Sequence, residues 1–270
     1  MQLYHHPYSI DSQRVRLALE EKSIDYTSFH LNPVTGKNMN VSFFRMNPSA
    51  TLPVFQNGGH KIFNTIEIIQ YVERIASVST GADSAENTPF SGREVTEWMH
   101  RLQQWNPKFF TLAHIPDKYF RSVSKFLRRV VMARMEESPD LAGAYHSKLQ
   151  EVYDTEDKLK NSSVLIHDKE HLIRLLDQVE KQLNETTYLV GEEFTMADVM
   201  LIPVLARLVL LNLEDEYIGT RPNTAKYWIT VQQRPSYKKV IASHFNGWRK
   251  YRTLWKTWFA IHSRSILRRF

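Results

Sequence analysis

The chain has 270 residues, 42% of them hydrophobic and 24% charged, which is a globular composition with room for two domains. It contains no cysteine, so disulfides, thiolate-bound zinc and a protein thiol nucleophile are excluded. Charge is uneven: twelve Lys and Arg but no Asp or Glu follow Glu216, whereas residues 1–216 hold 23 basic and all 29 acidic residues. The sequence does not open with a signal-peptide layout, and no apolar run is long enough to cross a bilayer, so we expect a cytoplasmic protein.

The first 78 residues predict a small α/β domain. Short apolar segments predict strands at residues 1–4, 25–31, 52–55 and 61–63. Helical patterns follow the first, second and fourth of these segments, and an Asn-Gly-Gly turn joins the last two strands as a hairpin. Strand, helix, strand, helix, two strands and helix is the order of one small α/β unit.

Ser9 lies at the junction of the first predicted strand and the first predicted helix. Helix N-termini attract anions, so this serine is a candidate to hold a thiolate, phosphate or carboxylate. The simpler interpretation is an ordinary helix cap, which serine provides very often. The two roles are compatible, because a cap uses an oxygen lone pair and leaves the hydroxyl proton free to donate.

Residues 93–246 predict an all-helical domain, joined to the first by a polar linker at 79–92. Thr195 and Asp198 form a capping box at the start of an almost entirely apolar helix, which we expect at the centre of this domain. Residues 136–168 are charged and weakly patterned. They fit either an exposed helical excursion or a mobile insertion.

Residues 247–270 form a basic tail. Large apolar residues recur there at three- and four-residue steps between seven Lys and Arg. This pattern is typical of a helix in the interface of an anionic membrane, which would make the protein peripheral at the plasma membrane. The alternative is a helix packed on the domain. The charges exclude a transmembrane span.

Four motifs, found in order over about residues 1–245, resemble those of the glutathione S-transferase family: HPYSIDSQRVRLALEEK, NPSATLPVF, FNTIEIIQYVE and YLVGEEFTMADV. Within the family the chain is most similar to the plant tetrachlorohydroquinone dehalogenase-like class (TCHQD). The resemblance implies an α+β fold, with a thioredoxin-like domain containing a four-stranded mixed sheet followed by an all-α domain. It also implies glutathione as cosubstrate, a hydrophobic electrophile as partner and no metal. Homodimers are the habit of the family, although the insertion could block the dimer face.

The resemblance places Ser9 at the glutathione sulfur, where its hydroxyl would activate the thiol. A free thiol has a pKa near 8.5, and a hydrogen bond at a helix N-terminus favours the thiolate. Leu52 would offer its backbone to the cysteinyl part of glutathione. The bond before Pro53 is expected to be cis.

Four further residues are implied to bind glutathione. Asn64 and Thr65 match the pair at the γ-glutamyl end, and Lys37 and Asn38 lie where the family contacts the glycyl carboxylate. The first position of the γ-glutamyl pair is usually acidic, so neutral Asn64 could hydrogen-bond the ligand ammonium but not pair with it ionically. Lys37 has the equally good interpretation of a solvated loop lysine.

The position of Asp11 limits the chemistry. The bacterial dehalogenases carry a cysteine there, which attacks the mixed thioether; Asp11 cannot, and we expect it to be a favourable charge in the first helical turn. Two functions are left: a serine-type glutathione transferase that conjugates an electrophile or reduces a peroxide, and a catalytically weak ligand-binding or scaffold protein at a membrane.

Other patterns are weaker. His167 and His171 fit the spacing of a zinc peptidase, which we interpret as a coincidence, and His5-His6 is interpreted as a structural strand end. Aromatic residues at helical spacing could line an acceptor pocket but are more typical of a core: Trp98, Trp105, Phe109, Phe110 and Tyr119. No nucleic-acid-binding motif accompanies the basic residues, so no nucleic acid is expected.

Overall fold

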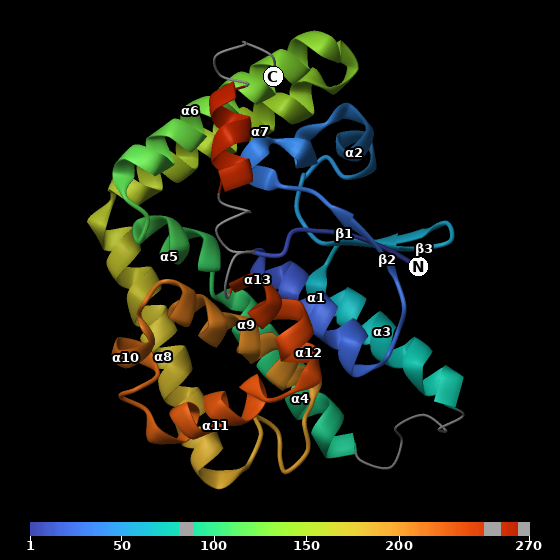
Figure 1. Cartoon of the computed structure of the whole chain (residues 1–270), viewed down its shortest axis with the longest axis vertical. Helices are drawn as coiled ribbons and strands as arrows, with labels where there is room; N and C mark the ends of the chain where they lie inside the picture. The colour runs from blue at the N-terminus through green and yellow to red at the C-terminus, as the bar shows by residue number, and fades with distance from the viewer. Residues whose placement is uncertain (81–88, 246–254, 264–270) are drawn as a thin grey trace.

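The structure, a computed structural model, describes residues 1–80, 89–245 and 255–263 (Figure 1). It contains a four-stranded mixed sheet with its helices, followed by a helical domain. The predicted α+β fold class is therefore confirmed. No helix within the described ranges has the length and apolar character needed to cross a membrane.

The sheet has the strand order β2-β1-β3-β4. Its strands are β1 (Gln2–His5), β2 (Thr27–His30), β3 (Val54–Asn57) and β4 (His60–Ile62). β1 is parallel to β2, and β3 is antiparallel to both β1 and β4. The carboxyl ends of β1, β2 and β4 and the amino end of β3 therefore lie at one edge of the sheet.

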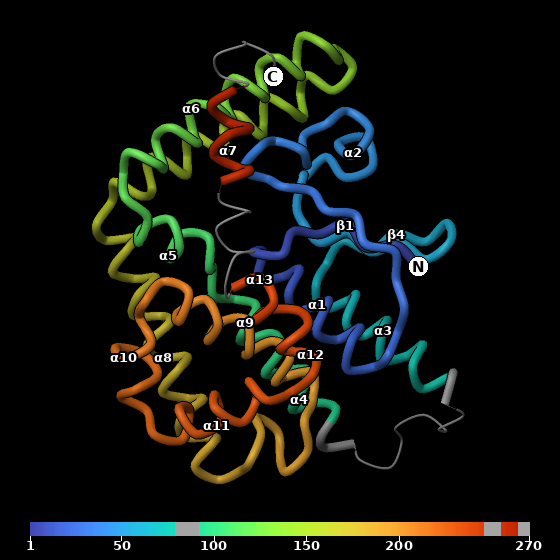
Figure 2. The backbone as a smooth tube through the Cα atoms, in the orientation of Figure 1, coloured from blue at the N-terminus to red at the C-terminus, as the bar shows by residue number. Residues whose placement is uncertain are grey.

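The helices of this domain cover both faces of the sheet. They are α1 (Ile10–Glu21), α2 (Val41–Met46) and α3 (Thr65–Thr80), with short 3-10 turns η1 (Pro33–Thr35) and η2 (Lys37–Met39) before α2. α1 and α3 lie on one face and α2 on the other (Figure 2). α1 packs against both α3 and a helix of the second domain, so residues 12–19 are all buried.

The second domain is helical throughout its described part. Its helices are α4 (Pro89–Gln104), α5 (Pro107–Ala113), α6 (Asp117–Glu137), α7 (Ala142–Lys160), α8 (Ser162–Glu185), α9 (Met196–Leu210), α10 (Glu214–Tyr217), α11 (Pro222–Gln232), α12 (Pro235–Tyr237) and α13 (Ser243–Phe245), with the short turns η3 (Pro139–Leu141) and η4 (Lys238–Ala242). The linker expected at 79–92 overlaps α3 and α4, and residues 81–88 lie outside the described ranges.

α9 lies at the centre of the second domain, as its apolar sequence predicts. The predicted capping box is present: the Thr195 hydroxyl accepts from the Ala197 amide at 3.3 Å, and the Asp198 carboxylate accepts from the Thr195 amide at 2.8 Å. The Asp198 carboxylate also accepts from the Leu189 amide and the Tyr227 hydroxyl, both at 3.0 Å. With the Thr195 hydroxyl, which donates at 3.1 Å, these donors satisfy a carboxylate that is fully buried.

The segment at 136–168 is helical and largely exposed, as one of the two expectations had it, but it is attached to the rest of the protein. Its main element, α7, pairs with α6 as a helical hairpin, which packs on the first domain through a second apolar cluster. In that cluster the ring of Tyr145 stacks on Phe44, with centroids 4.0 Å apart. The weak apolar pattern arises because only a few residues of α7, such as Tyr145, meet this small interface.

Within the tail, residues 255–263 form a helix that lies beside α6 and α7 in Figure 1. Ile261 packs against the second apolar cluster, and the Thr257 hydroxyl accepts from the Asn32 amide group at 2.8 Å. Trp255 and Phe259 are 69% and 62% exposed. One face of this helix therefore packs on the protein, while another presents aromatic rings to the outside. The rest of the tail lies outside the described residues.

Candidate active site

The residues predicted to contact glutathione come from four loops at one edge of the sheet. Ser9 follows β1, and the 37–38 turn follows β2. The Leu52-Pro53 pair precedes β3, and Asn64 follows β4. Because the strand register pairs Tyr4 with Val54, His5 with His30 and Phe55 with Ile62, all four loops start at neighbouring positions. The fold thus gathers the predicted residues on one side of the molecule.

Ser9 is the N-cap of α1, and its hydroxyl oxygen accepts from the Ser12 amide at 3.3 Å. Its own amide donates to the His6 carbonyl at 3.0 Å, and the Gln13 side chain donates to the Pro7 carbonyl at 2.7 Å. These bonds fix the turn and leave Ser9 half-buried. The cap uses one lone pair, so the hydroxyl proton is free to donate to a ligand.

The Leu52-Pro53 peptide bond is cis, as predicted. Pro53 is buried, whereas Leu52 is half-buried. Neither the amide nor the carbonyl of Leu52 forms a hydrogen bond within the part of the chain that the structure describes. Both groups are therefore available to an extended ligand backbone beside β3.

Asn64 caps α3 with its side-chain oxygen, which accepts from the amides of Ile66 at 2.9 Å and Glu67 at 3.2 Å. Two bonds use both lone pairs of this oxygen, so only the N–H groups of the side chain remain for a ligand. The expectation that Asn64 accepts a hydrogen bond from the ligand ammonium does not fit this arrangement. A carboxylate suits it better. Thr65, at the first position of α3, is 4% exposed.

Lys37 and Asn38 differ in exposure. Lys37 is exposed at the start of η2 and forms no ion pair with any described residue. Asn38 is 6% exposed, and its amide group donates to the Ala50 carbonyl at 2.8 Å. Asn38 therefore ties the 37–39 turn to the loop that carries Leu52.

Comparison with known proteins identifies the family. Residues 1–74 match the glutathione S-transferase N-terminal domain, and residues 143–244 match the glutathione S-transferase C-terminal domain. Glutathione S-transferase TCHQD of Arabidopsis thaliana is 66% identical over 270 residues, the full length of both chains. The chain belongs to the glutathione S-transferase family. The resemblance to the TCHQD class is confirmed, and glutathione-dependent catalysis is the activity that this membership supports.

Two more distant relatives agree with this assignment. The tetrachloro-P-hydroquinone reductive dehalogenase of Sphingobium chlorophenolicum is 24% identical over 241 residues, covering 87% of this chain and 93% of that protein. Glutathione transferase F2 from Populus trichocarpa has a TM-score of 0.63 and 20% identity, covering 93% and 99% of the two chains. This similarity shows that the chain and the poplar transferase share the same fold.

Two buried histidines lie beside the serine turn of this transferase. Burial, together with the positive charge of Arg16 and neighbouring histidines, lowers the pKa of His5 to about 2. Burial lowers the pKa of His6 to about 4, with contributions from His30, Arg207 and His244. Both rings are neutral at physiological pH, so they add no positive charge to the site.

Residues of the second domain also contact the turn that precedes Ser9. The sequence analysis did not predict these contacts. The Tyr8 hydroxyl donates to the His244 carbonyl at 2.9 Å, and the Tyr8 ring stacks on Phe245 at 5.5 Å. Arg207 donates to the Tyr8 carbonyl. A signal existed for the arginine, because Arg207 is the only charged residue between Asp198 and Leu213 in the sequence.

Asp11 has a larger role than the expected charge in the first helical turn. Its carboxylate accepts from Arg14 at 2.9 Å. Arg14 is 1% exposed and also donates to the carbonyls of Met200 at 3.1 Å and Leu102 at 3.0 Å. Asp11 therefore neutralises the arginine that joins the two domains beside the site.

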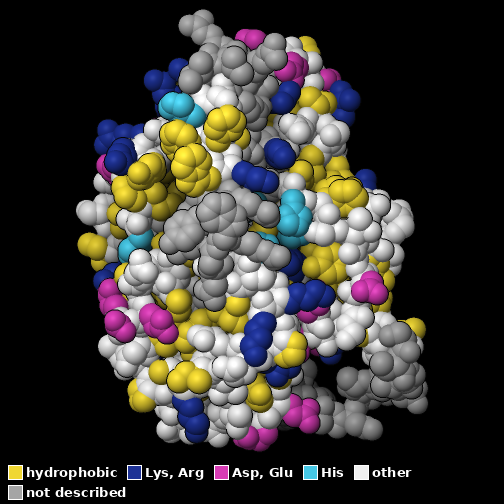
Figure 3. Space-filling view, viewed as in Figure 1, with side chains coloured by type: hydrophobic (Ala, Val, Ile, Leu, Met, Phe, Trp, Pro, Cys, Tyr) yellow, Lys and Arg dark blue, Asp and Glu magenta, His cyan; other side chains and the backbone are white. Residues whose placement is uncertain are grey.

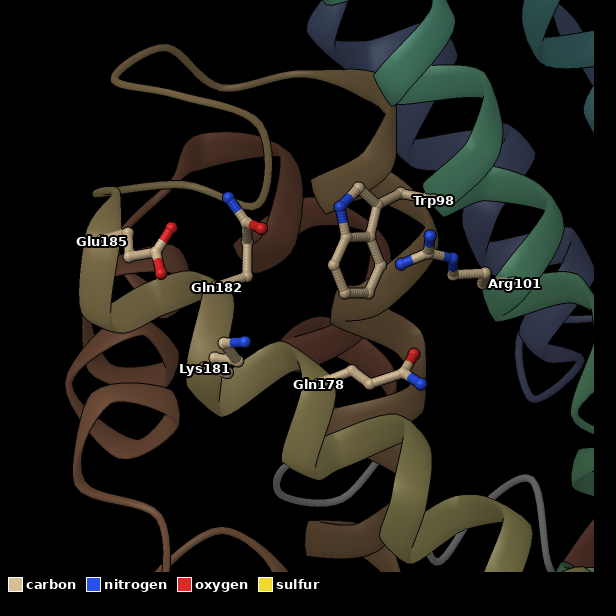
Figure 4. A pocket seen from close by; sticks show the side chains of 6 residues that line it. All are labelled: Trp98, Arg101, Gln178, Lys181, Gln182 and Glu185. Carbon is tan, nitrogen blue, oxygen red and sulfur yellow. The ribbon is translucent and has the colours of Figure 1, made fainter.

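The remaining candidates lie elsewhere. Trp98, Trp105 and Phe110 belong to the apolar core, as expected for aromatics at helical spacing. A cavity of about 370 Å³ is formed by α4 and α8, away from the sheet edge (Figure 4). Its lining includes Trp98, one of the aromatic residues considered for an acceptor pocket, but none of the predicted glutathione contacts. The lining residues are Trp98, Arg101, Gln178, Lys181, Gln182 and Glu185. His167 and His171 both lie on α8, and no cluster of three potential metal ligands occurs among the described residues.

Proposed function

We propose that Ser9 donates a hydrogen bond to the sulfur of bound glutathione and holds it as a thiolate. The observation that carries this proposal is the half-buried Ser9 hydroxyl at the N-terminus of α1, whose lone pair caps the helix and whose proton is free. The thiolate then attacks a hydrophobic electrophile or reduces a peroxide. Ser9 is not itself the nucleophile.

The Ser9 hydrogen bond and the N-terminus of α1 can supply the free energy needed to ionise the thiol. Lowering a thiol pKa by two units needs about 2.7 kcal/mol. A hydrogen bond to a charged group contributes about 1.5–3 kcal/mol, and a helix N-terminus adds about 0.3–1 kcal/mol. Ser9 and α1 together can therefore make the bound thiol mostly ionised near neutral pH.

The other loops supply the rest of the glutathione site in this proposal. The free backbone groups of Leu52, held beside cis Pro53, pair with the cysteinyl unit. Thr65 and the outward N–H groups of Asn64 bind the γ-glutamyl carboxylate at the N-terminus of α3. The γ-glutamyl ammonium lacks an acidic partner at Asn64, so binding is weaker than with a carboxylate there.

Lys37 and Asn38 take different parts at the glycyl end. The exposed ammonium of Lys37 pairs with the glycyl carboxylate. Buried Asn38 acts on the ligand indirectly, by fixing the Leu52 loop through the Ala50 carbonyl.

The absence of cysteine defines which reactions the site can complete. The thioether formed by conjugation leaves as product, because no protein thiol is available to attack it. The relative from Sphingobium is named a reductive dehalogenase. Reduction through a protein–glutathione disulfide is excluded for this chain.

Ser9→Ala and Ser9→Thr test the proposal. Ser9→Ala should reduce kcat/KM for conjugation by about tenfold or more, while Ser9→Thr keeps much of the activity, since a hydroxyl hydrogen bond to an anion is worth about 1.5–3 kcal/mol. Asn161→Ala is the matched control, because Asn161 caps α8 through the Ser163 amide, far from the sheet edge. It should lose a similar stability of about 1 kcal/mol and keep its activity. Equal activity of wild type and Ser9→Ala would reject the catalytic role.

A second candidate function rests on the helix at 255–263. Figure 3 shows hydrophobic side chains gathered on the face where this helix lies, and Trp255, Trp258 and Phe259 are all more than half exposed. Exposed aromatic rings on a helix that carries Lys256, within a tail sequence rich in Lys and Arg, suit the interface of an anionic membrane. The protein would then bind ligands or act as a scaffold at the membrane, with catalysis weak or absent.

Liposome sedimentation tests this second candidate. The full chain should sediment with anionic vesicles in a salt-sensitive manner, and truncation after Asn246 should abolish it. The double variant Trp255→Ser with Phe259→Ser should bind weakly while keeping the inward-facing Ile261. Ile229→Ser, which removes a 64% exposed side chain on α11, is the control. Undiminished binding by the truncated protein would refute the membrane role.

A further inference from the structure

We propose that Arg207, a residue of the central helix α9, is a positioning residue for the thiolate: its buried charge and its bond to the Tyr8 carbonyl stabilise the anionic sulfur beside Ser9. This inference rests on the proposed role of Ser9 and adds a second source of thiolate stabilisation to it. It concerns a residue from outside the thioredoxin-like domain.

The first argument is the position of Arg207. Its guanidinium donates to the Tyr8 carbonyl and, at 2.8 Å, to the hydroxyl of Thr111 on α5. Tyr8 immediately precedes Ser9, so the guanidinium lies one peptide unit from the proposed sulfur contact. The Tyr8 carbonyl oxygen is the negative end of a peptide dipole, and Arg207 counters its negative charge. The negative charge of the proposed thiolate lies next to this carbonyl, so the guanidinium favours it too.

The second argument is that the charge is uncompensated. Arg207 is 8% exposed, and within the described ranges no carboxylate forms an ion pair with it. Its Nε–H is buried and has no partner among the described residues. Burial lowers the pKa of Arg207 to about 10, which still leaves it charged at neutral pH. An isolated buried cation is costly, and an anionic ligand sulfur would relieve that cost.

Two other arginines of this region, Arg14 and Arg16 on α1, are also buried. Arg14 is equally enclosed, but Asp11 pairs with it at 2.9 Å. Asp11 therefore neutralises Arg14, whereas neither Arg207 nor Arg16 forms an ion pair with a carboxylate among the described residues; Arg16 instead donates to the Val240 carbonyl at 3.2 Å and the Tyr26 hydroxyl at 3.3 Å. The field of Arg207 also reaches the turn, since it contributes to lowering the pKa of His6.

The two histidines beside the serine turn do not supply a positive charge that could replace that of Arg207. His5 and His6 are neutral at physiological pH because burial lowers their pKa values to about 2 and 4. Arg16 donates to the Val240 carbonyl at 3.2 Å, and its positive charge also reaches this region, since it contributes to lowering the pKa of His5. His114 on α5 bonds the Phe110 carbonyl. Other charged or titratable groups on these elements and near the turn include Asp11, Arg14, His30, Lys108, Asp198 and His244.

The test is the pH dependence of conjugation in Arg207→Gln, Arg207→Lys and Thr111→Val. Removing the charge should raise the pKa of the bound thiol by about one unit, so kcat/KM of Arg207→Gln falls about tenfold near pH 6.5 and approaches wild type at high pH, where the thiol ionises unaided. Thr111→Val keeps the charge and loses one hydrogen bond, so its profile should match wild type. Arg207→Lys should lie between wild type and Arg207→Gln.

A loss of kcat/KM in Arg207→Gln that is the same at every pH would overturn the proposal and leave only a structural role.

A second measurement needs no variant of Arg207. In Ser9→Ala, glutathione sulfonate, which is anionic at sulfur, should still bind about tenfold more tightly than S-methylglutathione, because the guanidinium is intact. Equal binding would also overturn the proposal. Activity that depends on Ser9 but not on Arg207 rejects this inference alone, whereas activity that is independent of Ser9 rejects the proposed function.

Discussion

Tyr145 of α7 lies parallel on Phe44 of α2, with ring centroids 4.0 Å apart and an angle of 5° between the planes. Its hydroxyl donates to the Met39 carbonyl at 2.8 Å. The inserted hairpin is thereby attached to the turn that carries Lys37, a proposed glutathione contact, and Asn38, which holds the Leu52 loop through the Ala50 carbonyl. In the proposed function, the insertion therefore supports the glycyl end of the glutathione site.

Removing this attachment should weaken both the fold and the site. Tyr145→Phe should destabilise the protein by about 1 kcal/mol, and Tyr145→Ala by about 3–5 kcal/mol, in urea unfolding. Both variants should raise the Kd for glutathione, since the 37–39 turn loses its support. Tyr153→Phe on the exposed side of the same helix is the control and should leave both quantities unchanged. Unaltered glutathione binding in Tyr145→Ala would show that the insertion is independent of the site.

The contact between Gly36 and Val130 gives a second prediction. Gly36 has a φ of 70°, and a Cβ there would lie 2.8 Å from a Val130 methyl carbon. Gly36→Ala should therefore cost about 1–2 kcal/mol for the left-handed backbone and about 1–3 kcal/mol for the clash with α6. In a double-mutant cycle with Val130→Ala, the part of this loss in unfolding free energy that comes from the clash should disappear. The part that comes from the left-handed backbone should remain. Strictly additive free energies of unfolding would contradict this packing.

The buried histidines predict unusual sensitivity to mild acid. The folded state holds the pKa values of His5 and His6 at about 2 and 4, below the ordinary value of 6.5, so the unfolded state binds more protons between those values. The contribution of the two histidines to the free energy of unfolding should be fully present above about pH 6.5. Below that pH, the free energy of unfolding should fall by about 1.4 kcal/mol per pH unit for each histidine.

Urea unfolding between about pH 7 and pH 5 measures this slope. His6→Gln should remove about half of it, because one of the two titrating groups is gone. His60→Gln, which changes an exposed histidine in β4, should leave the slope as in wild type. If the slope of His6→Gln equals that of wild type, His6 is not held neutral by burial.

Local patterns in the sequence were sufficient for most of the fold. The strands, the boundaries of α2 and the capping box at Thr195 depend on turn residues and on apolar spacing, which act over a few residues. The four loops that carry Ser9, the 37–38 turn, Leu52 and Asn64 likewise meet at one edge because the strand order requires it. The cis bond before Pro53 followed from the family resemblance alone.

The parts that could not be predicted depend on contacts between distant segments. The packing of α7 on α2 needs Tyr145 and Phe44 to meet across about a hundred residues, and no periodicity encodes that pairing. The same is true of Asn38, whose burial follows from its bond to Ala50, and of Arg207, whose partner Tyr8 belongs to another domain. The side-chain oxygen of Asn64 caps α3, so the proposed contact of Asn64 with glutathione uses its N–H groups, which the sequence alone did not indicate.

The central claim is that Ser9 ionises bound glutathione, and ultraviolet titration of the thiolate in the glutathione complex tests it most directly. The wild-type complex should show a thiol pKa about one to two units below the free value of about 8.5, Ser9→Thr should stay close to wild type, and Ser9→Ala should return most of the way to the free value. Asn161→Ala should titrate as wild type. Identical thiol pKa values in the wild-type and Ser9→Ala complexes would contradict the account.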